Sequence, residues 1–259
     1  MTQEAARIAA IYRYPVKGLS PEPLNSIALT PGETLPFDRA YAIESGNHEF
    51  DEEAPEYLPK TKFLMLMRDE RLATLRTSVD SESGDMTVLR DGKQVARGNL
   101  TQRIGRQMLE QFFAAFMGEK MRGAPRIVHA EGHSFSDVPA KAVSIINLAS
   151  VRDLERVMGQ TVDPLRFRAN IYIDGIAPWR EFDWLERELM VGEDVVLRVF
   201  KRTQRCAATN VDPATGERDL QIPRALHSAF GHADMGIYAT VAAGGGIAVG
   251  QAVTPPPAE

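Results

Sequence analysis

The apolar residues of this chain fall into short stretches, rich in β-branched and aromatic side chains, that are separated by Gly, Pro and Asp turn signals. Stretches of this length and composition predict β-strands. Because strands are many and helical patterns few, β-barrels with helical insertions are favoured over an alternating βαβ sheet. We therefore expect a mainly β chain with α insertions, of the α+β class. The strand-like stretches cover residues 7–17, 23–33, 37–45, 71–98, 141–147, 168–175, 194–202 and 236–253.

Two stretches have the periodicity of amphipathic helices. The first is expected to begin with Thr101 as its cap and to end at Gly118. The second is expected to begin at Ser150, with Asp153 completing a near capping box, and to end at Gly159. The apolar residues that set these periodicities are Ile104, Met108, Phe112, Phe113 and Phe116 in the first helix and Leu154, Val157 and Met158 in the second.

Turn residues fix several connections between the predicted strands. Asp91-Gly92 lies between MTVLR and KQVAR and is the strongest hairpin signal in the chain. Pro31-Gly32 separates two other strands, and the glycine run 244–246 suits a tight bend at a barrel corner. The Pro-rich end, TPPPAE at 254–259, is expected to be loose because it has little to bury.

Composition excludes several classes of protein. The net charge of -5 argues against a general binder of nucleic acid or anionic membranes. The single cysteine rules out an intramolecular disulfide and any thiolate-only zinc or iron–sulfur site. No signal peptide and no apolar run long enough to span a membrane is found in the sequence. We therefore expect a cytoplasmic protein that binds neither nucleic acid nor membranes.

The single cysteine, Cys206, follows three basic residues in the stretch KRTQRC. Cations near a thiol favour the thiolate, the form that attacks electrophiles and binds metals. The turn pairs Asp212-Pro213 and Thr215-Gly216 follow closely and would place the thiol at the lip of a tight loop. The alternative interpretation is a small, buried apolar side chain without chemical function.

Basic residues also cluster in DPLRFRANIYIDG. In an extended segment, Arg166, Arg168 and Asn170 would share one face, which must meet either solvent or an anion. Lys17 and Arg39 would extend the same anion pocket if the fold brings them there. A structural ion pair with Asp38 is the alternative role for Arg39.

Several catalytic classes lack their motifs. His129 and His133 are spaced i, i+4 but lie in HAEGH rather than HExxH, which argues against a zinc hydrolase. The sequence contains no G-x-S-x-G elbow, P-loop, CxxCH haem motif or GxGxxG loop opening a helix. Acyl transfer and nucleotide hydrolysis therefore have no support from motifs.

Four stretches, in this order, resemble the MOSC family, named after the C-terminal domain of molybdenum cofactor sulfurase. They are YPVKG (14–18), FDRAYAI (37–43), FRANIYIDG (167–175) with PWRE after it, and RCAATNVDPATGERD (205–219). The Arg-Cys pair followed by a Thr and an Asp-Pro turn is the most specific of them. The resemblance implies an N-terminal β-barrel domain over residues 4–118, a MOSC β-barrel domain over 119–253 and a disordered tail over 254–259.

The resemblance also implies a cofactor and its ligands. In this family the motif cysteine is the protein ligand of molybdenum, which here corresponds to Cys206. A single thiolate suffices because the pterin cofactor brings its own dithiolene sulfurs. The anionic cofactor would be held by charge-assisted hydrogen bonds. The residues implied to hold it are Lys17, Arg39, Arg168, Asn170 and Arg205, with Ser134 of the SFSD stretch as a further contact.

The sequence departs from the family pattern in three places. Gly18 replaces the Ser that commonly follows the Lys of PVK, and Ala169 replaces a Pro between Arg168 and Asn170. An Ala-Arg-Gln stretch usual in the closest reductases is missing, and the acidic segment 46–63 stands in its place. The last departure bears on the substrate more than on the cofactor.

The resemblance predicts a molybdenum-cofactor oxidoreductase similar to amidoxime-reducing proteins, acting on N-hydroxylated small molecules. Its electrons would come from a separate iron–sulfur, flavin or haem protein. The acidic stretch HEFDEEAPE (48–56) would offer that protein a docking site if it is not merely a solvated loop. One alternative is a carrier of sulfur, as a Cys206 persulfide, or of the molybdenum cofactor. Others are a binding module without redox activity and, at the family level, a pyridoxal phosphate Schiff base on Lys17.

Overall fold

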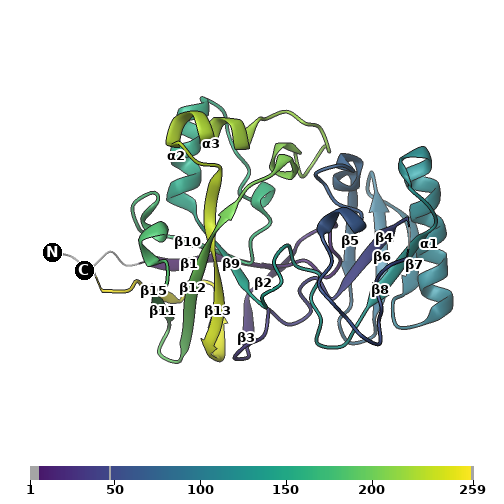
Figure 1. The fold of residues 1–259 in the computed structure, drawn as a ribbon, viewed down its shortest axis with the longest axis horizontal. Helices are drawn as coiled ribbons and strands as arrows, with labels where there is room; N and C mark the ends of the chain where they lie inside the picture. The colour runs from purple at the N-terminus through teal and green to yellow at the C-terminus, as the bar shows by residue number, and fades with distance from the viewer. Residues whose placement is uncertain (1–5, 47, 258–259) are drawn as a thin grey trace.

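The first strand of the computed structural model, β1 (Ala6–Arg13), pairs with strands that lie far along the sequence. The structure describes residues 6–46 and 48–257. β1 is antiparallel both to β10 (Ile171–Asp174) and to β15 (Ala252–Thr254), which are themselves linked through further strands. These pairings close a ring in which neighbours follow the order β1-β10-β9-β13-β12-β11-β15. The described part of the chain therefore contains a closed seven-stranded barrel, on the left of Figure 1.

The barrel interior follows the two-residue period of its strands. The remaining members are β9 (Val143–Asn147), β11 (Glu188–Val191), β12 (Val195–Gln204) and β13 (Asp234–Ala243). Along β12, Val195, Leu197 and Val199 are buried while their neighbours are more exposed. The inward side chains join those of the other strands in one apolar core. The predicted mainly β chain with helical insertions is confirmed.

Two helices cover one end of the barrel. α2 (Leu148–Met158) connects the parallel strands β9 and β10, and α3 (Ile222–Phe230) precedes β13 (Figure 1). The predicted start of α2 at Ser150 is wrong, because the Asn147 side chain accepts a hydrogen bond from the Ala149 amide and caps the helix earlier. The predicted end at Gly159 is confirmed by its left-handed backbone. Val157, expected inside, is 40% exposed.

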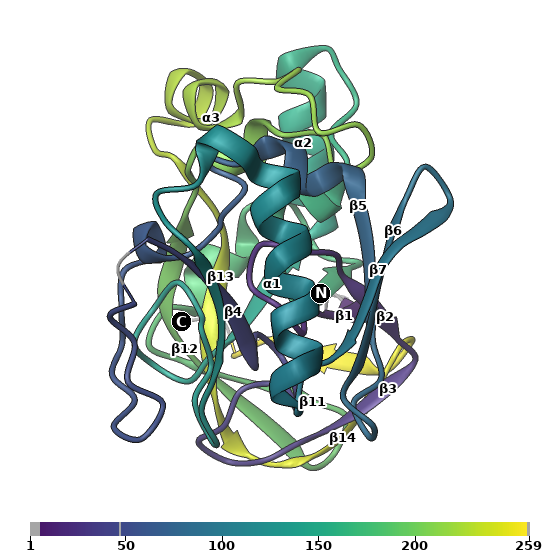
Figure 2. The same cartoon turned by 90° about the vertical axis from the view of Figure 1, so that its right-hand side faces the viewer.

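Residues 37–129, here called the N-terminal region, pack beside the barrel. β4 (Tyr41–Ser45) pairs with β8 (Pro125–His129), and β5 (Leu75–Val79), β6 (Asp85–Arg90) and β7 (Lys93–Asn99) form a meander. The helix α1 (Arg103–Met117) lies against both sheets (Figure 2). The Asp91-Gly92 hairpin is confirmed, with positive φ angles at both residues.

The buried face of α1 agrees with the predicted one in part. Phe113 and Phe116 are buried as expected, and Leu109 is buried as well, whereas Ile104 and Met108 are 72% and 55% exposed. The helix begins at Arg103 with Gln102 at the cap position. Thr101, the predicted cap, instead donates its hydroxyl to Asn99 Oδ1 at 2.5 Å. The end of the helix at Gly118 is confirmed.

Short elements complete the structure around the junction of the two parts. β2 (Glu22–Leu24) extends the barrel sheet beside β1, and β3 (Ser26–Leu29) pairs with β14 (Gly245–Ala248). β14 follows the bend at the glycine run, where the chain leaves the barrel. Several single turns of 3₁₀-helix lie between the strands: η1 (Lys60–Lys62), η2 (Glu70–Thr74), η3 (Gly118–Lys120), η4 (Pro164–Phe167), η5 (Arg180–Trp184) and η6 (Ala207–Asn210).

Strand pairing crosses the predicted boundary between residues 118 and 119. β1 belongs to the barrel although it lies at the start of the chain, and β8 belongs to the N-terminal region although it follows residue 118. The division at 118/119 stays a prediction. Of the predicted tail, Thr254 ends β15, and residues 258–259 lie outside the described residues. Among the described helices, none has the length and apolar character to cross a membrane.

Candidate functional site

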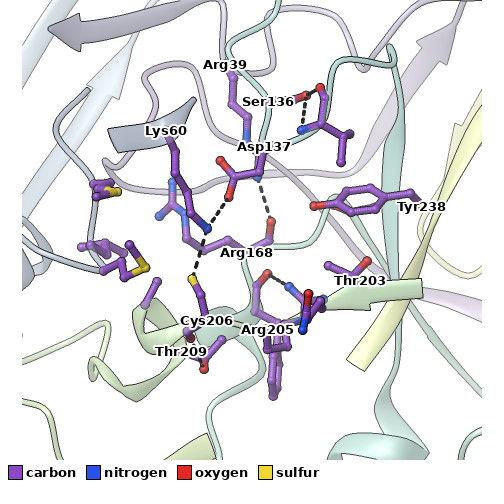
Figure 3. Close-up of a pocket in the computed structure, with 18 of the residues that line it drawn as sticks. Arg39, Lys60, Ser136, Asp137, Arg168, Thr203, Arg205, Cys206, Thr209 and Tyr238 are labelled. Atoms are coloured by element: carbon purple, nitrogen blue, oxygen red, sulfur yellow. Dashed lines mark hydrogen bonds and ion pairs between the residues drawn. The ribbon is translucent and has the colours of Figure 1, made fainter. Parts of the chain in front are cut away.

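A cavity of about 270 Å³ lies where the N-terminal region meets the barrel. Strand β12 and the loop after it form one side, and residues 60–67 form part of the other. Figure 3 shows charged side chains from both parts pointing into it. Among the described residues its lining contains eight cationic side chains and two carboxylates. The cations are Lys17, Arg39, Lys60, Arg166, Arg168, Lys201, Arg202 and Arg205, and the carboxylates are Asp38 and Asp137.

Cys206 stands at this cavity, directly after β12. It has an extended backbone and forms the N-cap of η6, where Thr209 donates its backbone amide and its hydroxyl to the Cys206 carbonyl at 3.1 and 2.9 Å. The Asp212 carboxylate then accepts the Ala214 and Thr215 amides at 2.7 and 2.8 Å and closes the predicted tight loop. The thiol is half-buried and lines the cavity, as the sequence predicted.

Lys60, Asp137 and Lys17 form a charged network beside the thiol. The Lys60 ammonium lies 3.4 Å from Cys206 Sγ and 3.6 Å from Asp137 Oδ2 (Figure 3). Lys17 Nζ donates to the other oxygen of Asp137 at 2.5 Å and to the Phe135 carbonyl at 2.8 Å. Burial acts to raise the pKa of Asp137, but the two lysines lower it well below its ordinary value. The Asp137 side chain is 46% exposed, so solvent weakens these ion pairs.

Arg39 and Arg168 enclose the ring of the buried Tyr14. Their guanidinium carbons lie 4.8 and 4.2 Å from the ring centroid. Arg39 pairs with Asp38, the structural role expected as the alternative, and also donates to the Arg168 carbonyl at 3.0 Å. Burial acts to lower the pKa of Arg39, but Asp38 outweighs it and raises that pKa. Both arginines have left-handed backbones, a strained conformation typical of positions fixed by their surroundings.

Arg205 and Asn170 form the cavity wall but use their polar groups inside the protein. The Arg205 guanidinium donates to the Phe167 carbonyl at 2.8 Å and through two nitrogens to the Met235 carbonyl. Asn170 Oδ1 accepts the Ser144 amide and hydroxyl at 3.1 and 2.9 Å. These contacts fix β12, β13 and β9 in register around the cavity.

Ser134 is the predicted site residue that the structure does not bring to the cavity. Its hydroxyl donates to the Asp38 carbonyl at 3.0 Å, away from the described lining. Two later residues of the same SFSD stretch, Ser136 and Asp137, line the cavity instead (Figure 3). The stretch was therefore assigned correctly to the site, but the contact lies two to three residues further along.

The expected shared face of Arg166, Arg168 and Asn170 is wrong. Arg166 lies in η4 and Arg168 has a left-handed backbone, so the segment is not extended at these residues. Arg166 still lines the cavity, but its buried guanidinium pairs with Asp212 and Asp219 at 3.1 and 2.7 Å. These ion pairs anchor the loop that follows Cys206.

Four polar atoms of residues that line the cavity are buried and, among the described residues, have no hydrogen-bond partner. They are Arg166 Nε, Arg168 Nη2, Arg202 Nε and Thr203 Oγ1. Burial lowers the pKa of both Arg168 and Arg205, which reflects the cost of holding a charge away from water. Buried donors normally find partners, and each one left without costs about 1–3 kcal/mol. An anion with several oxygens fits this set of donors, as the phosphate of a pterin cofactor would.

The sequence did not single out Lys60, Asp137, Arg202, Thr203 or Tyr238 as site residues. Lys60 lies four residues after the acidic stretch 48–56, which was interpreted as a solvated or donor-docking surface. Tyr238 lies on β13, and burial raises the pKa of its hydroxyl, which Figure 3 shows directed into the cavity. Lys201, Arg202 and Arg205 were noted as neighbours of Cys206, which was the available signal for Arg202.

The structure explains the glycine at position 18. Its φ is +82°, and a Cβ placed there would lie 2.8 Å from the Leu64 carbonyl oxygen. A Ser side chain therefore does not fit between the loop after β1 and residue 64. The departure from the family pattern is a consequence of this close backbone approach.

Comparisons with known proteins agree with this geometry. Residues 130–254 match the family model described as the MOSC domain. A stretch of 90 residues is 34% identical to mitochondrial amidoxime-reducing component 1 of Mus musculus, covering 35% of this chain and 25% of that protein. Another of 76 residues is 41% identical to molybdenum cofactor sulfurase of Drosophila mojavensis, covering 29% of this chain and 9% of that protein. The matched stretches thus span a quarter or less of these relatives.

Among solved structures, the YUAD protein of Bacillus subtilis superposes with a TM-score of 0.45 at 10% sequence identity. The superposition covers 96% of this chain and 94% of that protein.

Proposed function

Because residues 130–254 match the family model of the MOSC domain, we propose that the protein binds the molybdenum cofactor beside Cys206 and reduces N-hydroxylated small molecules there. The observation that carries this proposal is the position of the thiol. The sole cysteine of the sequence lines the same cavity as buried cationic donors that have no partner among the described residues. One soft ligand beside an anion site is what a metal held on an anionic organic cofactor requires.

The residues fall into distinct roles toward that cofactor. Cys206 Sγ would bind the molybdenum, and Arg168, Arg202 and Thr203 would donate to the phosphate through their free N–H and O–H groups. Arg205 and Asn170 would act indirectly, because their hydrogen bonds hold the strands that carry these donors. Arg39 would keep Arg168 in place by donating a hydrogen bond to the Arg168 carbonyl. When bound, the cofactor would supply the two-electron chemistry of the reduction.

The overall reaction would convert an N-hydroxylated compound, two electrons and two protons into the reduced amine or amidine and water. The electrons would come from a separate donor protein of the iron–sulfur, flavin or haem type, because these 259 residues supply one cysteine and none of the usual redox motifs. Relatives named as amidoxime-reducing components support the reductase assignment.

A sulfur carrier is the second candidate function. It is favoured by the match to a molybdenum cofactor sulfurase and by the ammonium group of Lys60 beside Sγ. A Schiff base on Lys17 has less support, since Lys17 Nζ is already engaged by Asp137 and the Phe135 carbonyl. Pyridoxal phosphate at that residue would have to break both contacts.

The test measures two quantities in protein made in a host that synthesises the cofactor. Molybdenum is measured by elemental analysis, and pterin is measured after its release by denaturation. We expect about one molybdenum per chain in the wild type and a loss of metal in Cys206→Ser. Ser134→Ala is the matched control, because its hydroxyl lies away from the cavity. Wild-type protein without metal or pterin would overturn the proposal, and a Cys206 persulfide in that protein would favour the carrier instead.

A further inference from the structure

Lys60 approaches the cavity from the N-terminal region, opposite the strand that carries Cys206. It begins η1, its side chain is 30% exposed, and its ammonium lies 3.4 Å from Cys206 Sγ. A ligand that reacts next to the sulfur must therefore pass close to this charge.

The Lys60 ammonium has hydrogen-bonding capacity to spare. An ammonium has three N–H donors, and one is used by Cys206 Sγ. The ion pair with Asp137 is 3.6 Å long, too far for a normal hydrogen bond. At least one donor is therefore free for a ligand.

The charges around the cavity leave Lys60 without full compensation. Asp137 is shared between Lys60 and Lys17, so these three groups together carry one net positive charge. The cofactor phosphate, with a charge of about -1.5 to -2, has its own candidate partners elsewhere. Arg168, Lys201, Arg202 and Arg205 line the cavity and form no salt bridge with any described residue. Apart from its hydrogen bond to Cys206 Sγ and the shared Asp137, the charge of Lys60 is thus left for the substrate.

The same segment also supplies an apolar surface. Met65, Leu66 and Met67 follow Lys60 by a few residues and line the cavity with it. Residues 60–67 therefore present one cation and an apolar surface to whatever enters.

We infer that Lys60 selects substrates that carry a negative charge near their reducible N–O group, with an apolar part against Met65–Met67. This inference rests on the proposed function and names the class of substrate for the same site. Lys60 acts by charge and by a hydrogen bond to the substrate, and its role does not depend on binding the cofactor.

The first test uses the apoprotein and the single thiol. Cys206 is alkylated with iodoacetate, which is anionic, and with iodoacetamide, which is neutral and of similar size. In both reactions an S–C bond forms and iodide leaves, so the ratio of the two rates cancels any change in the reactivity of the thiol itself. We expect this ratio to fall about fourfold in Lys60→Gln and to stay near the wild-type value in Lys60→Arg.

Lys62→Gln is the matched control. Lys62 lies in the same 3₁₀ turn, but its ammonium pairs with Glu49 at 2.7 Å on the surface. The ratio in this variant should equal that of the wild type. An unchanged ratio in Lys60→Gln, or an equal fall in Lys62→Gln, would overturn the inference.

The second test uses holoenzyme with dithionite-reduced viologen as electron donor. Benzamidoxime and its 4-carboxylate share the same reducible group and differ by one anionic substituent on the ring. We expect the ratio of kcat/KM for the carboxylate over the neutral substrate to fall about fourfold in Lys60→Gln but not in Lys62→Gln. Protein that lacks molybdenum but shows the alkylation effect would refute the proposed function alone. Metal-loaded protein without either effect would refute the inference alone.

Discussion

The two sides of the cavity are built in different ways. On the barrel side, Arg205 and Cys206 follow the long strand β12, and backbone carbonyls of β13 and η4 hold the arginine. On the N-terminal side, Lys60 enters from a single 3₁₀ turn and is held by side chains, Asp137 and Cys206. Under the proposed function, the barrel side would hold the cofactor through groups fixed by the backbone. The N-terminal side would contact the substrate through Lys60.

The apolar cores of the two parts are also separate. The barrel core and the core of the N-terminal region share no buried residue, and the polar cavity lies between them. If the two parts are as distinct as their cores, a large-to-small substitution in the core of one part should leave the other part folded. Selective unfolding of one part is the largest effect that the comparison predicts.

Phe113→Ala should destabilise the N-terminal region by about 3–5 kcal/mol, because Phe113 is fully buried beneath α1. Both tryptophans, Trp179 and Trp184, pack in the barrel core, so tryptophan fluorescence reports the barrel. In urea, we expect the variant's unfolding transition seen by far-ultraviolet circular dichroism to move to a lower urea concentration, while the transition seen by fluorescence stays near that of the wild type. Leu197→Ala, in the barrel, is the control that should shift the fluorescence transition. Coincident shifts in both variants would show one cooperative unit.

Gly18→Ser tests the contact where the loop after β1 meets the N-terminal region. The added Cβ would meet the Leu64 carbonyl at 2.8 Å in a left-handed backbone, and we expect a loss of about 1–3 kcal/mol in urea unfolding. Gly32→Ser is the matched control, since its φ is +74° but its Cβ would meet nothing within 4 Å. Equal losses in the two variants would mean that backbone strain alone, and not the contact, explains the glycine.

Glu70→Gln tests a smaller link between the two parts. Glu70 accepts from Lys120 at 2.7 Å in the N-terminal region and from Arg218 at 3.1 Å in the loop after Cys206. Burial acts to raise the pKa of Glu70, but these partners lower it to about 2. At pH 6 we expect the variant to be less stable by about 1 kcal/mol or less, because the side chain is partly exposed.

The pH dependence of that difference follows from the lowered pKa. A carboxyl whose pKa is lower in the folded protein stabilises it above the unfolded value and loses this effect as the pH falls through the folded value. The difference in the free energy of unfolding between wild type and Glu70→Gln should therefore be complete above pH 4.5 and become smaller toward pH 2. The exposed Glu56→Gln, measured in parallel, should show no such difference. A difference that is constant with pH would contradict the ion-pair role.

Sequence patterns predicted turns and helix ends better than they predicted which side chains pack together or become hydrogen-bonded at the site. The Asp91-Gly92 hairpin and the helix ends at Gly118 and Gly159 follow from local chemistry, and all three are confirmed. The inward face of α1 was predicted only in part. Phe113 and Phe116 are buried, but Ile104 and Met108 are apolar and yet exposed, so apolar character alone does not identify the packed face. Long-range packing makes that choice.

For the site, motifs placed Cys206, Lys17, Arg39, Arg168, Asn170 and Arg205 at one cavity. The motifs did not distinguish side chains that are free from those engaged within the protein. Arg205 and Asn170 are engaged, while Arg202 and Thr203 have free donors among the described residues. Lys60 was missed because its partner is 146 residues away in the sequence and its acidic neighbours suggested a surface loop.

The pairing of β1 with both β10 and β15 has a consequence for the order of folding during synthesis. Ala6 and Arg7 need Val253 and Ala252 as partners, so the ring cannot close until nearly all of the described chain has left the ribosome. Until then the apolar side chains of β1, Ile8 and Ile11, have no barrel to enter. Pairings so distant in sequence form slowly and leave strand edges open in the meantime. The nascent N-terminal strand is therefore the segment most in need of protection from aggregation while the protein is made.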